Sequence, residues 1–187
     1  EIVRIGTRTP CTWPERITED LADILASHHP LWVNTQFNHP KEVTEKVSRA
    51  IDILLKRGIP IGNQSVLLRG VNDSAEIMKE LLQKLVRIRI RPYYLYQAQH
   101  LAGTGHFVTA IEDGIAIIRQ IRGWTTGFSV PQYVLDTPYG KVPINPEYLM
   151  GREGDEMVMQ SFDGKIWREK NPLIKDSEQI SKEHWHL

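Results

Sequence analysis

The sequence predicts an α/β fold with a parallel sheet, either wound open or rolled as a barrel, that is followed by a C-terminal β-hairpin. The first observation is a series of four short β-rich runs, at residues 2–5, 31–37, 59–68 and 90–96. The second is that helical patterns fill the gaps between these runs, so that each β-α unit takes about 30 residues. Parallel strands need such crossover connections, whereas antiparallel strands can be joined by tight turns.

Four helices are predicted from apolar periodicity, and most have a recognisable start or end. Thr18 can cap the first helix, and Ser74 or Asp73 the third. Pro40 fits the first turn of the second helix, which Gly58 ends. The apolar stripes that would face the sheet are, in chain order, Leu21, Ala22, Ile24 and Leu25; Val43, Val47, Ile51, Leu54 and Leu55; Ile77, Met78, Leu81, Leu82, Leu85 and Val86; and, within 111–122, Ile111, Ile115, Ile118 and Ile121.

Beyond Gly123 the alternation of helices and strands ends. Residues 128–136 and 156–162 have the composition of strands, and Asp163-Gly164 forms a turn that predicts a terminal hairpin. The last stretch of the chain is polar. The predicted organisation is therefore a βα portion at 1–123, a C-terminal segment with the hairpin at 124–168, and a polar tail at 169–187.

Composition excludes several classes of protein. Of the 187 residues, 41% are hydrophobic, which argues against a disordered chain. The 23 basic and 23 acidic residues balance, so we expect no nucleic-acid partner. No apolar run approaches the roughly 20 residues that a membrane helix needs, so we expect no membrane partner. A single cysteine, Cys11, excludes an internal disulfide framework and favours a reducing compartment, so we expect a cytoplasmic location.

Polar residues follow each predicted strand, where the ligand sites of parallel α/β folds gather. The amide of Gln64 could bind a ligand or could be a satisfied amide of an ordinary loop. Lys141 lies among Pro138, Gly140 and Pro143, which indicates a constrained turn. Such a lysine could form a Schiff base, although most single lysines are surface solubilisers. Asp136 could be a helix cap, an ion-pair partner or a substrate ligand, and its position alone does not decide.

Six segments of the chain match one known family in order. They are EIVRIGTRTP at 1–10, FNHPKE at 37–42, GNQSVLLRGVND at 62–73, RPYYLY at 91–96, GHF at 105–107, and the run from Asp136 to the GKVP that ends at Pro143. With these segments the chain resembles the lysine 2,3-aminomutase family over roughly residues 1–168. Members of this family are radical S-adenosylmethionine (SAM) enzymes that also use pyridoxal 5′-phosphate (PLP).

The resemblance implies a partial (β/α) barrel of the radical SAM type, with about four βα units in this chain. It implies a [4Fe-4S] cluster that cleaves SAM, giving a radical that abstracts hydrogen from an amino acid held by PLP. The amino group then moves from C2 to C3, and the PLP π-system is what delocalises the radical. We therefore expect an isomerase with a small-molecule amino acid substrate, by default the conversion of L-lysine to β-lysine.

Four site residues follow from the resemblance by matching position to position. Lys141 corresponds to the catalytic lysine that binds PLP as a Schiff base. Gln64 corresponds to a glutamine that contacts SAM, and Tyr96 to a tyrosine near the cofactors. Asp136 corresponds to one of two aspartates that hold the distal ammonium group of substrate lysine.

The sequence also departs from the family pattern. Gln99 stands where the second ammonium-binding aspartate is expected, and a single carboxylate weakens the electrostatic argument for lysine as substrate. Gln36 replaces a histidine near SAM, which keeps hydrogen bonding but not titration. The glycine run before Lys141 is shortened to Tyr139-Gly140. Ser74 stands where some members carry a zinc-ligating cysteine, so we expect no zinc.

The family's CxxxCxxC cluster motif does not occur in the chain, which cannot supply three cysteine ligands. We expect these ligands upstream of Glu1, and no metal ligands among the 187 residues. The chain is thus interpreted as the C-terminal portion of a longer enzyme, inactive alone, whose full-length form we expect to be a homo-oligomer.

The sequence alone leaves other functions open. Within the family, arginine, glutamate or another amino acid is a possible substrate, as is the relative that makes β-lysine for elongation factor P. A different class is a Schiff-base aldolase or lyase on an α/β barrel, with Lys141 active and no radical chemistry. A third hypothesis is that the chain is a degenerate domain without catalytic activity.

Overall fold

The computed structural model describes residues 2–170 and divides the chain after Pro146 into two compact units. Each unit contains its own sheet. The elements of the first unit are β1 (Val3–Gly6), α1 (Thr9–Thr12), η1 (Pro14–Arg16), α2 (Glu19–Ala26), β2 (Leu31–Thr35), η2 (Pro40–Glu42), α3 (Glu45–Lys56), β3 (Ile61–Leu67), α4 (Ala75–Arg87), β4 (Arg91–Gln97), η3 (Gly105–Phe107), α5 (Ile111–Ile121), η4 (Gly127–Ser129), β5 (Gln132–Thr137) and β6 (Gly140–Pro143).

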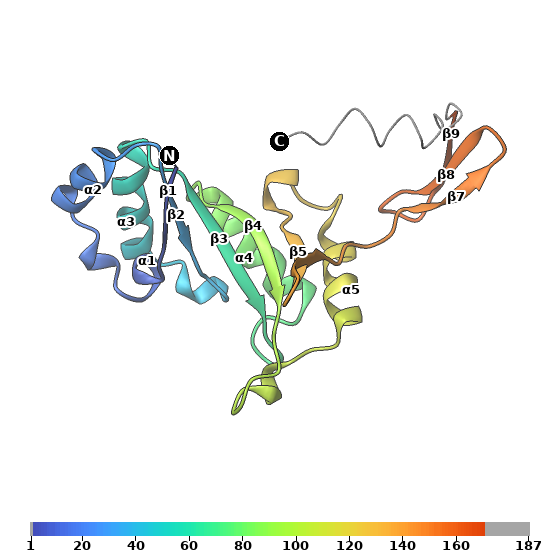
Figure 1. Ribbon diagram of the computed structural model, residues 1–187, viewed down its shortest axis with the longest axis horizontal. Helices are drawn as coiled ribbons and strands as arrows, with labels where there is room; N and C mark the ends of the chain where they lie inside the picture. Colours follow the sequence, from blue (N-terminus) through green and yellow to red (C-terminus); the bar gives the residue numbers. More distant parts are fainter. Residues whose placement is uncertain (1, 171–187) are drawn as a thin grey trace. The chain divides into compact units, whose positions relative to one another are not determined.

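The sheet of the first unit has six strands in the order β1-β2-β3-β4-β5-β6 (Figure 1). Strands β1 to β5 are parallel neighbours, and β6 returns antiparallel to β5. A helix follows each of the first four strands, which confirms the predicted α/β class with four βα units. Because β1 to β5 run parallel, all of their carboxyl ends lie along one edge of the sheet.

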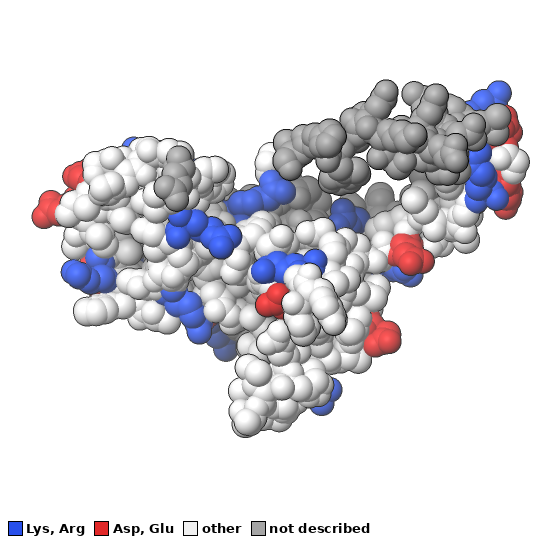
Figure 2. Space-filling view, in the orientation of Figure 1, with Lys and Arg blue, Asp and Glu red and all other residues white. Residues whose placement is uncertain are grey.

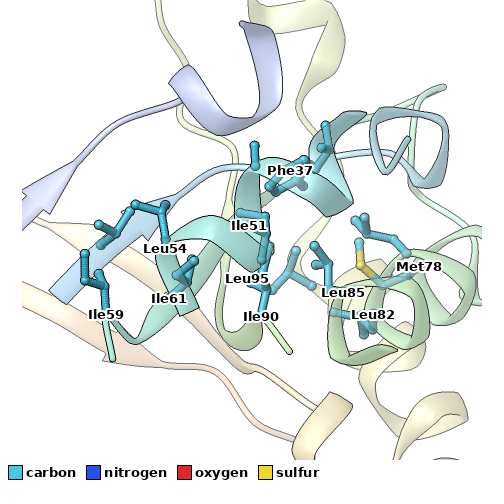
Figure 3. Close-up of a cluster of buried hydrophobic side chains, with 14 of the residues drawn as sticks. Phe37, Ile51, Leu54, Ile59, Ile61, Met78, Leu82, Leu85, Ile90 and Leu95 are labelled. Carbon is cyan, nitrogen blue, oxygen red and sulfur yellow. The ribbon is translucent and has the colours of Figure 1, made fainter. Parts of the chain in front are cut away.

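The helices of the first unit pack against one face of the sheet and bury it. In β2 the side chains of Leu31, Val33 and Thr35 are buried, while Trp32 and Asn34 between them are not. This alternation places the first set toward the helices and the second on the face without helices, which we call the open face. The core between sheet and helices is apolar and mostly aliphatic (Figure 3), and its labelled members are Phe37, Ile51, Leu54, Ile59, Ile61, Met78, Leu82, Leu85, Ile90 and Leu95.

The helix boundaries mostly follow the predicted signals. The Thr18 hydroxyl accepts a hydrogen bond from Leu21 N, and the Ser74 hydroxyl from Ile77 N, so Ser74 rather than Asp73 caps α4. The predicted start at Pro40 was wrong, because Pro40–Glu42 forms a separate 3₁₀ turn. Helix α3 begins at Glu45, where the Thr44 hydroxyl caps it through Val47 N.

The second unit carries a three-stranded antiparallel sheet of β7 (Leu149–Glu153), β8 (Glu156–Gln160) and β9 (Ile166–Lys170). The turn between β8 and β9 contains Asp163 and Gly164, so the predicted hairpin is confirmed. The boundary between the two compact units falls after Pro146, whereas the predicted divisions at 123 and 168 follow changes in sequence pattern and stay predictions. The predicted tail lies outside the described residues, apart from its first two positions.

No helix within residues 2–170 is long and apolar enough to cross a membrane. On the face shown in Figure 2, the lysine and arginine side chains lie in separate groups rather than in one continuous basic patch.

Candidate functional site

A pocket of about 240 Å³ lies at the carboxyl ends of the central strands of the first unit. Three of the six predicted site residues belong to the segments that form it: Tyr96 is on β4, Gln99 follows β4, and Asp136 is on β5. Its complete lining is Val66, Tyr96, Gln97, Ala98, Gln99, Leu101 and Asp136. The polar side chains from two strands thus converge on one small space, as expected at this edge of a parallel sheet.

Lys141 lies beside this pocket because β6 returns along β5. In the antiparallel register Lys141 is directly opposite Asp136, so both side chains are on the same face. The Lys141 Nζ is 3.9 Å from an Asp136 carboxylate oxygen and 5.9 Å from the centre of the Tyr96 ring. Both charged side chains are nearly half exposed, so the ion pair is weak and the amine is accessible from solvent. Lys141 is on a strand directly after the turn, not on the turn itself.

Tyr96 presents a neutral phenol to the pocket. Burial is the main cause that raises its pKa to about 12, and the charges of Tyr93 and Asp136 contribute. A phenol with this pKa keeps its proton at neutral pH and can donate a hydrogen bond. Its ring also offers an aromatic surface within cation–π distance of the Lys141 amine.

Gln99 ties the ends of β4 and β5 together. Its Nε2 donates a hydrogen bond of 3.2 Å to the main-chain carbonyl of Asp136. The amide oxygen of the same side chain stays available as an acceptor. Nearby, the amide of Arg69 donates to the carbonyl of Phe107, which attaches the loop after β4 to the end of β3.

The two other predicted residues do not line this pocket. The Gln64 side chain is on β3 and donates through Nε2 to the hydroxyl of Tyr93. Gln36 directly follows β2 between the buried residues Thr35 and Phe37, so strand alternation directs its side chain toward the open face. The predicted six residues are therefore arranged as a group of four around Lys141 and a pair of glutamines on the neighbouring strands.

The open face has a second cavity, of about 390 Å³, that sequence reasoning did not identify. Its lining includes Arg4, Arg91, Trp32 and Tyr93, with Trp32 48% exposed. A signal was present in the sequence, since Arg4 interrupts the apolar run at 2–5. In a parallel sheet covered on both faces such a strand would be apolar throughout, so a charge there indicates an uncovered face.

Nothing in residues 2–170 gathers three histidine, cysteine or acidic side chains that could hold a metal ion. Cys11 is half-buried and packs near Arg8 and Glu42. Burial is the first cause that raises the pKa of its thiol to about 11, and the negative charge of Glu42 is the second. A single thiol with this pKa stays protonated at neutral pH and is a poor ligand for an iron–sulfur cluster.

Comparison with known proteins identifies the family. A family model described as lysine-2,3-aminomutase matches residues 118–184. The L-lysine 2,3-aminomutase of Clostridium subterminale is 49% identical over 175 residues, which cover 92% of this chain and 42% of that protein. The chain belongs to the lysine 2,3-aminomutase family. It spans less than half the length of the curated relatives that it matches.

Other members of the lysine 2,3-aminomutase family differ in the substrate that their names state. The glutamate 2,3-aminomutase of Clostridioides difficile is 39% identical over 185 residues, covering 98% of this chain and 44% of that protein. Among solved structures, a radical SAM methyltransferase from Sphaerobacter thermophilus is similar, with a TM-score of 0.52 and 14% identity over 71% of this chain and 40% of that one. This similarity confirms the predicted partial barrel of the radical SAM type.

Proposed function

We propose that this chain is the part of a radical SAM, PLP-dependent 2,3-aminomutase that holds PLP and the amino acid substrate, with L-lysine as the default substrate. The observation that supports this most is the group of Lys141, Asp136, Tyr96 and Gln99 around one strand-end pocket. That group occurs in a chain that is 49% identical to an L-lysine 2,3-aminomutase over 92% of its length.

The residues around Lys141 fit PLP. The amine is accessible, and its one nearby carboxylate is at the distance of a weak ion pair, so it can react with an aldehyde once deprotonated. The ring of Tyr96 offers a face against which a planar cofactor can pack. When bound, PLP supplies a conjugated π-system that delocalises an unpaired electron beside the migrating nitrogen.

The residues described here do not fit an iron–sulfur cluster, because Cys11 is the only cysteine and no cluster of three ligands is present in residues 2–170. We therefore assign the ligands of the cluster to a part of the protein outside these residues. Gln36 and Gln64 are assigned to SAM. Their neutral amides can hydrogen-bond the polar groups of SAM without adding charge.

The pocket residues bind and orient the substrate in this proposal. Asp136 pairs with the distal cation of the substrate, which replaces the weak contact between Asp136 and Lys141. Gln99 holds the main chain of Asp136 through Nε2 and offers its free oxygen to the same cation. Tyr96 keeps its proton and donates it in a hydrogen bond.

Glutamate is the second candidate substrate, because a glutamate 2,3-aminomutase is 39% identical to this chain and because Gln99 is neutral. A pocket with one carboxylate discriminates less strongly for a distal cation than a pocket with two. Arginine, which also carries a distal cation, fits the same contacts. The expected cytoplasmic location and homo-oligomeric state stay predictions.

The test uses the full-length protein that contains this chain, with its cluster reconstituted and with SAM and PLP supplied. We expect L-lysine to be converted to β-lysine, and Lys141→Ala to reduce product below detection while leaving the fold intact. Lys165→Ala removes another exposed lysine and serves as the matched control with full activity. Borohydride reduction of the PLP-loaded protein should label Lys141; labelling of a different lysine would overturn the assignment.

The substrate is tested with Gln99→Asp in the same protein. A second carboxylate should raise kcat/KM for lysine relative to glutamate by about tenfold or more, since a desolvated charge pair contributes over 1.4 kcal/mol. An unchanged ratio would remove Gln99 from the specificity argument.

A further inference from the structure

Strands β2 and β3 separate at the edge that carries the candidate site, and side chains fill the opening. Their register ends at the pair Thr35 and Asn63, whereas β3 continues to Leu67. Beyond this pair, the main chain of Phe37 and Asn38 has no backbone partner on β3. Buried backbone groups without partners are costly, so other groups must satisfy them.

Asn63 supplies the first replacement. Its Oδ1 accepts from Phe37 N at 2.7 Å, and its Nδ2 donates to Phe37 O at 3.2 Å. One side-chain amide thus provides the donor and the acceptor that a neighbouring strand would otherwise present. The remaining Nδ2 hydrogen goes to the Ser65 hydroxyl, which itself donates to Phe37 O at 2.7 Å. Asn63 is fully buried, so these bonds are shielded from water.

Asn72 supplies the second replacement from the loop after β3. Its Nδ2 donates at 2.8 Å to the carbonyls of both Asn38 and Val66, and its Oδ1 accepts from Leu68 N at 2.7 Å. The Asn38 side chain completes the set by accepting from Val66 N. Asn72 is also fully buried, and all of its hydrogen-bonding capacity except one lone pair is used.

These bonds fix the backbone directly after Gln36 and on both sides of Gln64. Gln36 directly precedes Phe37, and Gln64 lies between Asn63 and Ser65. Asn63 lies on the helix-covered face and Asn72 in the loop after β3, while alternation directs the glutamine side chains to the open face. Beyond the last backbone pair, Thr35 and Asn63, the two segments are therefore connected by side-chain amides and not by a backbone ladder.

We propose that Asn63 and Asn72 are positioning residues, which fix the backbone next to Gln36 and Gln64 so that these two side chains are held in place to bind SAM. This rests on the proposed function, since SAM is the ligand assigned to the two glutamines. A purely structural role would make the same residues important for folding but not for cofactor affinity. The two roles can be told apart with two variants that lose the same amount of stability. A positioning role predicts weaker SAM binding only in the asparagine variant, whereas a purely structural role predicts the same SAM affinity in both.

The experiment compares Asn63→Ala with Leu82→Ala in the full-length protein. Leu82 is buried in α4 and touches none of these bonds, so it gives a matched loss of melting temperature. We expect Asn63→Ala to weaken SAM binding about 100-fold, as displacement of positioned groups commonly does, without changing PLP occupancy of Lys141. Leu82→Ala should retain wild-type SAM affinity. Equal SAM affinity in both variants would overturn the proposal.

Two further measurements separate the possible failures. If Asn63→Ala does not fold, Ser65→Ala removes the hydroxyl that donates to Phe37 O and accepts from Asn63 Nδ2, while Asn63 keeps both of its bonds to Phe37, so SAM binding should weaken to a smaller extent. In protein labelled with ¹⁵N-glutamine, the side-chain signals of Gln36 and Gln64 should shift in Asn63→Ala and stay in place in Leu82→Ala. Unmoved signals would overturn the positioning role. If the signals shift in Asn63→Ala but the wild-type protein does not bind SAM, the positioning of the two glutamines is supported and the proposed function is overturned.

Discussion

The two sides of the candidate site are built differently. On the side of β2 and β3, the backbone beside Gln36 and Gln64 is held by fully buried asparagines through hydrogen bonds near 2.8 Å. On the side of β5 and β6, Asp136 and Lys141 are nearly half exposed and separated by 3.9 Å. The first side is fixed before any ligand arrives, whereas the second consists of charged groups that exchange water for a ligand.

This difference indicates how one sheet divides its tasks. Buried amides cannot move without leaving unsatisfied groups, so they suit a part of the site that serves an invariant ligand. Exposed charges cost little to rearrange, so they suit the part that forms and breaks contacts during turnover. Substitutions on the two sides should therefore differ in how much they destabilise the protein. Four measurements of stability or reactivity test how rigid and how well buried each region is.

The largest effect is expected for Asn72→Ala. It removes the hydrogen bonds that Asn72 makes to the amide of Leu68 and to the carbonyls of Asn38 and Val66, which should lower the free energy of unfolding by about 3 kcal/mol. Urea denaturation measures this. Asn145→Ala, at an exposed position, is the control and should stay within about 0.5 kcal/mol. A loss below about 1 kcal/mol for Asn72→Ala would contradict the conclusion that its buried hydrogen bonds fix the backbone beside Gln36 and Gln64.

The second effect is the reactivity of Cys11 of α1, which lies near Glu42 at the end of η2. Burial and the charge of Glu42 raise its thiol pKa from 9.0 to about 11. Since only the thiolate reacts, alkylation by iodoacetamide at pH 8 should be about 100-fold slower than for an ordinary cysteine. The rate should keep rising with pH above 9 and level off near pH 11. A plateau near 9 would show that water reaches this region.

The third effect concerns the packing of β5, the strand that carries Asp136, against α5. Tyr133 of β5 packs on α5, where a Cβ added at Gly114 would lie 2.3 Å from its ring. Its hydroxyl donates to Gln97, which in turn donates to the carbonyl of Thr109. Gly114→Ala should cost about 2 kcal/mol by overpacking, despite the better helix propensity of alanine. Thermal unfolding measures this, and Gly127→Ala, where space is free, should be nearly neutral.

The smallest effect is expected for Asp136→Ala. Its carboxylate makes only an exposed contact with Lys141, so stability should change by less than about 0.5 kcal/mol. In the full-length enzyme the same substitution should raise KM for lysine. A loss of stability comparable to that of Asn72→Ala would contradict the distinction between the two sides.

Local signals in the sequence predicted much of the fold. The stripe of Val47, Ile51 and Leu54 is buried as its period indicated, and Ser74 caps its helix. The start of α3 was misplaced because Pro40 and Thr44 are both acceptable start signals, and only tertiary packing selects between them.

Less of the candidate site than of the fold could be predicted from the sequence. Strand ends could be expected to gather polar groups, but the contact of Lys141 with Asp136 depends on the antiparallel return of β6. The buried asparagines were not singled out, because an asparagine in a strand looks the same whether it satisfies the backbone or faces solvent. The individual roles of Lys141, Gln64 and Gln36 rest on the family resemblance and await the experiments above.

The hairpin that carries Lys141 also constrains how the chain can vary in length. Thr137 pairs with Gly140 and Asp136 with Lys141, so only two residues separate the strands. Neighbouring positions on a strand point to opposite sides, so an inserted residue that keeps the two-residue turn would shift the register by one and turn the lysine away from the pocket. Inserting two would return it to the same side. A change in the length of this hairpin therefore has to be taken up by the loop itself, or corrected by a bulge, for the lysine to keep facing the pocket.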